Sequence, residues 1–138
     1  MKRLMLVLSM VVLLVGGCCG VAYPEELRTG LIDTSDPREA LKIKTISWVA
    51  DGWFLAKWKI LVENNSTSDW KDILFKGVYF GESGTAIKNS VFDYTRYVVI
   101  RSGSTVLVIL DGVRCPKQAV AGGANIVKAT LCEYNLCE

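Results

Sequence analysis

The chain has 138 residues, of which 51% are hydrophobic, a size that suits a single domain with one modest core. Its formal net charge of +2 comes from Lys2 and Arg3, because without these two the 16 basic residues become 14 and equal the 14 acidic ones. A body with no net charge and no basic cluster gives no support for nucleic-acid binding, and the absence of histidine removes the commonest general base and metal ligand.

The N-terminus has the pattern of an export signal. Lys2 and Arg3 precede Leu4–Val15, an apolar run of twelve residues, which suits the hydrophobic region of a signal peptide and is short for a bilayer span. The next residues, Val15-Gly16-Gly17-Cys18, resemble a bacterial lipobox, whose cysteine is diacylated and becomes the new N-terminus. The resemblance implies that residues 1–17 are a lipoprotein signal peptide and that Cys18 is the lipidation site.

Two other processing outcomes are compatible with the same residues. Gly20-Val21-Ala22 could direct ordinary secretory cleavage before Tyr23, giving a secreted or periplasmic protein, or the apolar stretch could stay uncleaved as an anchor. All three outcomes export the domain. With a lipid at Cys18 holding it to the membrane, we expect the protein in the cell envelope, at the outer membrane or cell surface, because no Asp follows Cys18 as an inner-membrane retention signal.

Residues 18–40 are expected to form a polar linker, and residues 41–138 the folded domain. Pro24, Gly30 and Pro37 interrupt the linker, which has no sustained hydrophobic period. Its one local signal is Asp36 before Pro37, with Glu39 three residues after the cap, the pattern of a helix N-cap. We expect a single helical turn there, leading into Leu41.

The first part of the domain predicts a β-hairpin. Alternating apolar runs at residues 41–50 and 53–62 flank Asp51-Gly52, a pair typical of a two-residue type I′ turn. Such a turn fixes the register and pairs Leu41 with Val62 and Val49 with Phe54. It directs Trp58 inward and Lys59 outward, although it also sets Lys44 opposite Lys59, a like-charge pair that counts against it.

In this register the outer face of the hairpin carries an aromatic patch. Trp48, Trp53 and Leu55 would project near the hairpin tip, on the side that carries the lysines. An exposed apolar patch often marks an interaction site, so these three residues are the candidate binding surface. The alternative is that another strand, a loop or the linker covers them.

The remainder of the chain indicates an all-β fold. Further strands are expected at residues 71–80, 91–100, 104–110 and 125–134, with turns at residues 63–69, 81–84, 101–103 and 111–112. Short strands about ten residues apart are typical of an immunoglobulin-like antiparallel β-sandwich, here of about seven strands. In the turn at residues 63–69, the Asn and Asp side chains are expected to bond their own backbone.

About fifty residues resemble a family of small extracytoplasmic immunoglobulin-like domains named for a Phe-x-Leu-Tyr-Asp motif. The resemblance is carried by Asn64-Asn65-Ser66, Tyr79-Phe80, Gly84 and the turn from Ile100 to Ser104. The chain departs from the family pattern at Gly77 and Gly81. The resemblance implies a sandwich on a bacterial surface protein and brings no catalytic residue with it.

The cysteines leave several pairings open. If Cys18 is acylated, Cys19, Cys115, Cys132 and Cys137 remain, an even set with three complete pairings. Cys132 with Cys137 would close a small loop, and Cys115 with either of them is the rival bond. Their spacing is not a zinc pattern, and a redox role is the less favoured alternative.

These observations predict a non-catalytic envelope lipoprotein whose sandwich is a binding or accessory module for a protein or glycan. No cofactor, metal or catalytic motif is found. One alternative is a purely structural envelope component. A hydrolase with paired carboxylates is another, and its candidate residues are Asp69, Asp72, Glu82 and Asp93.

Overall fold

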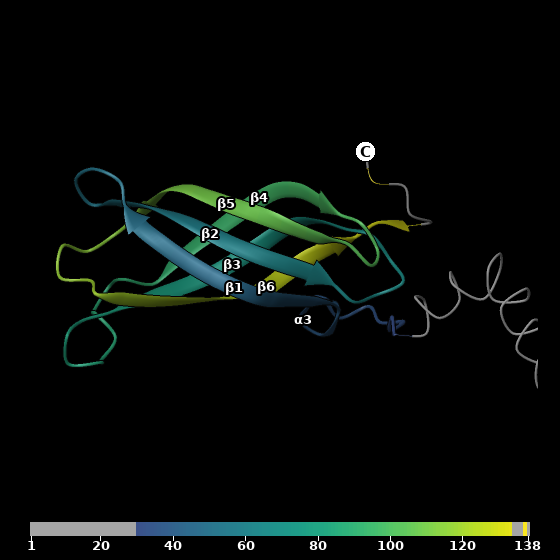
Figure 1. Cartoon of the computed structure of the whole chain (residues 1–138), viewed down its shortest axis with the longest axis horizontal. Coiled ribbons are helices and arrows are strands. Elements are labelled where there is room, and N and C mark those ends of the chain that lie inside the picture. Colours follow the sequence, from purple (N-terminus) through teal and green to yellow (C-terminus); the bar gives the residue numbers. More distant parts are fainter. Residues whose placement is uncertain (1–29, 134–136, 138) are drawn as a thin grey trace, which may run out of the picture. The chain divides into compact units, whose positions relative to one another are not determined.

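The domain is an all-β sandwich of two three-stranded sheets (Figure 1). This computed structural model describes residues 30–133 and residue 137. Its elements are α3 (Pro37–Ala40), β1 (Leu41–Ala50), β2 (Leu55–Asn64), β3 (Trp70–Phe80), β4 (Phe92–Ile100), β5 (Thr105–Arg114) and β6 (Ala121–Leu131). The predicted sandwich is confirmed, with six strands among the described residues rather than about seven.

Both sheets are antiparallel, in the orders β1-β2-β5 and β4-β3-β6. If the six strands are lettered A, B, C, C′, E and F along the chain, these sheets correspond to the neighbours A-B-E and C′-C-F of an immunoglobulin-like sandwich. The chain therefore changes sheet after β2, β4 and β5. Among the described residues, no helix is long and apolar enough to cross a membrane. The predicted signal peptide, Cys18 and Cys19 lie outside them.

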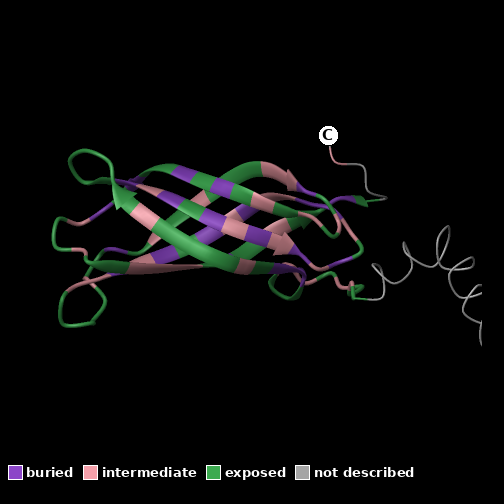
Figure 2. Ribbon diagram, in the orientation of Figure 1, coloured by how far each residue is buried: buried purple, intermediate pink, exposed green. Residues whose placement is uncertain are grey.

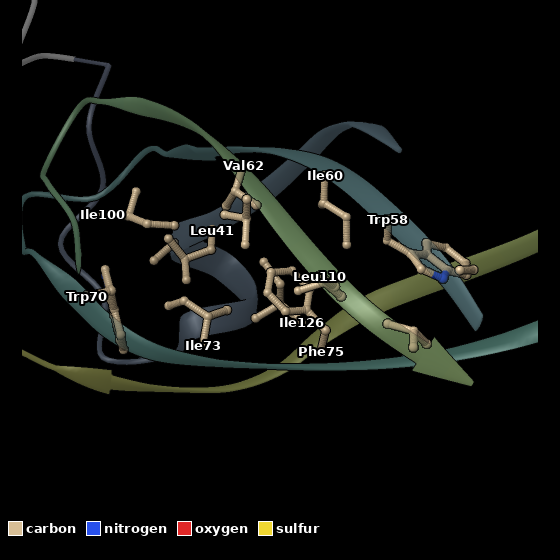
Figure 3. Close-up of a cluster of buried hydrophobic side chains, with 14 of the residues drawn as sticks. Leu41, Trp58, Ile60, Val62, Trp70, Ile73, Phe75, Ile100, Leu110 and Ile126 are labelled. Atoms are coloured by element: carbon tan, nitrogen blue, oxygen red, sulfur yellow. The ribbon is translucent and has the colours of Figure 1, made fainter. Parts of the chain in front are cut away.

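The core lies between the sheets and is built mainly from alternate residues of β2 and β3. In β2 every second residue from Ala56 to Asn64 is buried, and in β3 the same holds from Ile73 to Tyr79 (Figure 2). The labelled side chains of Figure 3 form one continuous row from Trp70 and Ile100 at one end to Trp58 at the other. Burying each large apolar side chain stabilises the fold by about 1.5–3 kcal/mol. The expected inward position of Trp58 and outward position of Lys59 are confirmed.

The predicted register of the first hairpin is wrong. Ala50 pairs with Ala56 rather than with Trp53. The four residues Asp51–Phe54 separate β1 from β2, and the Asp51 N–H donates to the Leu55 carbonyl at 2.9 Å. A register shift between Ile43 and Thr45 also changes the parity of β1, so that Leu41 faces inward at its start and Trp48 lies opposite the buried Trp58.

The charges of the hairpin agree with the observed register. Lys44 now forms an ion pair with Glu63, with Nζ and Oε2 3.0 Å apart, instead of facing another lysine. Lys59 faces Ser47, and Lys57 faces Val49, which is 60% exposed. The like-charge pair of the predicted register is therefore absent from the hairpin.

Two boundaries near the C-terminus also differ from the prediction. Asp111-Gly112 is not a turn but an irregularity within β5, where the pairing with β2 shifts between Leu110 and Val113 and Gly112 has φ 68°. Glycine adopts this conformation without the Cβ clash that other residues meet. The last strand starts at Ala121, earlier than the expected residue 125.

In the turn between β2 and β3, Asn64 bonds the turn's own backbone as the sequence predicts, whereas Asp69 accepts from Arg101 and Ser102 instead. Asn64 Oδ1 accepts hydrogen bonds from the backbone N–H and the hydroxyl of Ser66, and Asn64 Nδ2 donates to the Ser68 and Ile100 carbonyls. No buried side-chain N or O among the described residues lacks a partner. Since Asn64 is fully buried, these bonds hold the turn against the sandwich.

The end of the expected linker belongs to the sandwich. The Ile32 N–H donates to the Asn65 carbonyl at 2.7 Å, the following α3 ends at the fully buried Ala40, and the compact unit begins at Ile32. Asp36 caps α3 by accepting from the Arg38 N–H at 2.9 Å, as predicted. This bond and the Arg38 side chain lower the pKa of the Asp36 carboxyl.

Candidate functional site

Three loops meet at the end of the sandwich that is farthest from the entry of the chain. They are residues 51–54, 81–91 and 115–120, at the left of Figure 1, and we call this region the loop end. The turns after β2 and β4 lie at the opposite end, together with Ile32 and α3. Binding residues of β-sandwiches commonly lie on loops that the sheets hold in place.

The loop end contains an apolar pocket of about 290 Å³. Its wall is formed by the β1–β2 loop with the adjoining ends of β1 and β2 and by the β5–β6 loop, and only one charged residue lines it, Lys117. The large apolar residues around it are Trp48, Trp53, Phe54, Leu55 and Pro116. We call this hollow the apolar pocket.

The shape of the β1–β2 loop leaves its two aromatic residues in solvent. Trp53 is 85% exposed and Phe54 is 57% exposed, and their rings meet edge to face at 6.3 Å. Gly52 has φ 84° and Phe54 has φ 60°, a conformation that is unusual for a bulky side chain. The Phe54 carbonyl accepts from the Cys115 N–H at 2.8 Å, so this bond ties the loop to the start of the β5–β6 loop.

An aromatic cluster supports the pocket from below. Trp48 stacks on Trp58 with ring centroids 6.0 Å apart and meets Tyr79 edge-on at 5.2 Å. Trp58 Nε1 donates to the Tyr79 hydroxyl at 2.8 Å, which satisfies the buried indole N–H. A Cβ at Gly122 would lie 2.7 Å from a Trp58 ring carbon, so the backbone of β6 packs directly on this cluster.

The titratable groups below the pocket are held in their neutral forms. Burial raises the pKa of Tyr79 to about 12. Burial likewise raises the pKa of the Cys115 thiol, and among the described residues Cys115 has no disulfide partner. A thiol is nucleophilic as its thiolate, so a raised pKa favours a structural role for Cys115.

The structure joins Cys132 to Cys137, and Cys115 is not bonded to any other cysteine in the part of the chain that the structure describes. Cys115 therefore pairs with neither of these two residues. Its buried Sγ lies beside the Pro116 carbonyl, with a sulfur–oxygen distance of 3.5 Å. The cysteine set expected after acylation also includes Cys19, which lies outside the described residues.

The predicted patch residues meet at one pocket, although not on one outer face. Trp53 and Leu55 are exposed, whereas Trp48 is half-buried and faces the aromatic cluster. The sequence prediction missed Phe54 and Pro116. If the sequence prediction had used a four-residue turn, Phe54 would have been placed in the exposed loop. No sequence signal shows that the distant β5–β6 loop completes the wall.

Three candidate carboxylates of the hydrolase hypothesis, Asp69, Glu82 and Asp93, lie in separate places on the sandwich, and the fourth, Asp72, lies near the start of β3. Asp69 is buried and accepts from the Arg101 side chain and the Ser102 N–H, both at 2.8 Å. Glu82 follows the other end of β3, roughly 30 Å away along the strand. Asp93 lies opposite Lys76, within the paired part of β4. Among the described residues, no group of three or more acidic or cysteine side chains is placed to hold a metal.

Solved structures with a similar fold were found, whereas no protein-family model and no curated protein matches the chain significantly. A DUF1425 family member from Shewanella sp. pv-4 is 11% identical over 65% of this chain and 79% of that one, with a TM-score of 0.45. Campylobacter jejuni Cj0090 is 15% identical over 70% and 95% of the two chains, with a TM-score of 0.43. The structural genomics target SoR45 is 11% identical over 69% and 87%, with a TM-score of 0.37. The likeness to these small β-sandwich proteins is one of fold.

Proposed function

We propose that this chain is a non-catalytic lipoprotein of the cell envelope whose sandwich is a binding module for a protein partner. The lipobox-like residues before Cys18 support acylation there, and the resemblance to the Phe-x-Leu-Tyr-Asp family agrees with an extracytoplasmic sandwich. Two or more acyl chains would make a firm tether. The proposed binding surface is the apolar pocket with its exposed rim.

The exposure of Trp53 is the observation that supports this proposal most strongly. A tryptophan that is 85% exposed and stands beside a half-exposed Phe54 leaves a large apolar area in water. Burying such aromatic residues dominates the energy of many protein interfaces. A glycan would require several polar groups for its hydroxyls, whereas the pocket wall is mainly apolar and carries one charge, Lys117. The pocket therefore suits an apolar side chain of a protein.

Crosslinking in native envelopes, read by mass spectrometry, tests the binding surface. Trp53→Ala should remove one or more crosslinked proteins that the wild type captures. Tyr97→Ala is the matched control, because Tyr97 is a 79% exposed aromatic residue on β4, outside the lining of the apolar pocket. An identical partner set for wild type and Trp53→Ala would overturn the proposed surface.

The lipid anchor is tested separately by intact-mass measurement of the membrane-bound protein. We expect a chain that begins at Cys18 and carries the mass of its acyl groups. Cys18→Ser should lose the acyl mass and accumulate as unprocessed precursor. A mature wild-type chain with an unmodified N-terminus at Tyr23 would show ordinary secretion instead.

A further inference from the structure

A second hollow lies beside the apolar pocket at the loop end. It has a volume of about 430 Å³ and is lined by the β3–β4 loop on one side and the β5–β6 loop on the other. Phe54, Cys115 and Pro116 line both hollows, so the two are neighbours on either side of a ridge that these three residues form. Because its charged residues are Lys88 and Arg114, we call it the basic hollow.

The two hollows carry positive charge without a compensating acid. No Asp or Glu lines either one. Lys88, Arg114 and Lys117 are all exposed, and in the described part of the chain none of them forms an ion pair. The chain thus has an apolar site and a cationic site side by side, although its body as a whole has no net charge.

Hydrogen bonds hold the walls of both hollows in place. On the β3–β4 side, the Tyr79 N–H donates to Ser90 Oγ at 3.2 Å, and the Ile87 N–H donates to the Tyr79 carbonyl at 2.9 Å. On the other side, the bond from the Cys115 N–H to the Phe54 carbonyl fixes the ridge. A site whose backbone is already ordered loses less entropy when it binds.

We propose that the two hollows form one groove for an extended segment of a protein partner that carries a large apolar residue next to an acidic one. The apolar side chain enters the apolar pocket beside Trp53, and the carboxylate lies against Arg114 and Lys88 in the basic hollow. A guanidinium binds a carboxylate through two parallel N–H donors, which gives direction as well as charge. The inference rests on the proposed function and specifies the chemistry of its partner.

A membrane surface is the other occupant that exposed tryptophan and lysine would suit. The hollows favour a peptide, because a flat bilayer interface would leave both of them unfilled. The polar residues Asn89 and Gln118 also line the basic hollow, where they are available to a peptide backbone. The experiment below separates these two occupants.

The test uses the full chain in phosphatidylcholine nanodiscs and a phage-displayed library of random short peptides. Selected peptides should combine a large apolar residue with Asp or Glu. The best peptide, fluorescently labelled, is then compared by anisotropy with its counterpart in which Asp and Glu become Asn and Gln. The counterpart should bind about ten-fold more weakly at low salt.

Substitutions in the chain test whether this difference in affinity between the two peptides comes from the groove. Lys88→Gln/Arg114→Gln should bind the acidic peptide and its amide counterpart equally, and Trp53→Ala should weaken both. The control Arg96→Gln/Lys128→Gln removes the same charge from exposed positions that do not line either hollow, and it should keep the ten-fold preference. A preference lost equally in the control would show a general charge effect and overturn the inference.

The remaining outcomes separate this inference from the proposed function. Peptides that require Trp53 but show no preference for acid would overturn the inference and leave the proposed function standing. A library without any enrichment would overturn the inference, and the crosslinking of Trp53→Ala would then decide the proposed function independently. Trp53-dependent co-sedimentation with phosphatidylglycerol vesicles, without peptide binding, would assign the groove to a membrane surface and overturn both.

Discussion

Gly122 on β6 is the position where the aromatic cluster leaves least room for a side chain. A Cβ there would meet two Trp58 ring carbons at 2.7 and 3.1 Å and Trp48 Nε1 at 3.0 Å. Ordinary contact starts at 3.4 Å, so the nearest approach is too short by about 0.7 Å. Trp58 cannot move away freely, because it is fully buried and its indole N–H is bonded to Tyr79.

Gly122→Ala should therefore destabilise the domain, and its neighbour supplies a matched control. Overpacking a well-filled site costs about 1–3 kcal/mol. Replacing glycine by alanine also lowers the entropy of the unfolded chain, which stabilises by about 0.4–1 kcal/mol. The net loss in Gly122→Ala should be about 1–2 kcal/mol. Gly123→Ala should instead be neutral or slightly stabilising, because a Cβ at Gly123 meets nothing within 4 Å.

Urea unfolding of the full chain in mild detergent, followed by tryptophan fluorescence, measures both variants. The midpoint should fall for Gly122→Ala and stay level or rise for Gly123→Ala, with similar slopes. If Gly122→Ala were as stable as Gly123→Ala, Trp48 and Trp58 would not be packed against β6 as described. The support of the apolar pocket would then need a different arrangement.

Two further predictions concern polar groups in the interior. The pKa of Tyr79 rises from its ordinary value near 10 to about 12. The neutral hydroxyl therefore makes its full contribution to the free energy of unfolding below pH 10. About 2–3 kcal/mol of that free energy should be lost between pH 10 and 12, because the tyrosine ionises in the unfolded state over this range. Tyr79→Phe should lose this part of the pH dependence, and parallel stability curves for the two proteins would contradict it. Asn64→Ala should cost about 2–4 kcal/mol in urea unfolding, because it leaves buried partners of Asn64 unpaired. The partly exposed Asn65, changed to alanine, is the control, and equal losses at both sites would refute the argument.

Much of the fold could be predicted from the sequence, because alternation of apolar residues reports directly on burial in a sheet. This worked best for β2 and β3, whose charge-free faces are the buried ones. The predicted register of the first hairpin was wrong for a physical reason that can be read from the sequence. In β1 the apolar residues change from odd positions, Leu41 and Ile43, to even ones, Ile46 and Trp48, which is the pattern that a bulge produces.

The candidate site could be predicted only in part, because its residues come from segments that are far apart in the chain. Trp53 and Leu55 were expected at the hairpin tip from local pattern alone. Pro116 and Arg114 reach the same end through the β2–β5 pairing and the irregularity at Gly112, which a local pattern does not specify. The long-range hydrogen bond between Phe54 and Cys115 cannot be predicted from hydrophobic periodicity either, and it completes the ridge between the two hollows.

The two ends of the sandwich differ in whether their polar side chains have bonding partners and whether their large apolar side chains are buried. At the end that contains Asn64, the buried polar side chains bond to one another or to the backbone, and Arg101 pairs with Asp69. At the loop end, Trp53 is exposed and Arg114 has no ion pair among the described residues. Asn64 and Trp53 are separated by the length of β2, roughly 30 Å. Substitutions that far apart act independently, so changes near Asn64 should alter stability without changing the groove, and changes at Trp53 should alter binding at nearly constant stability.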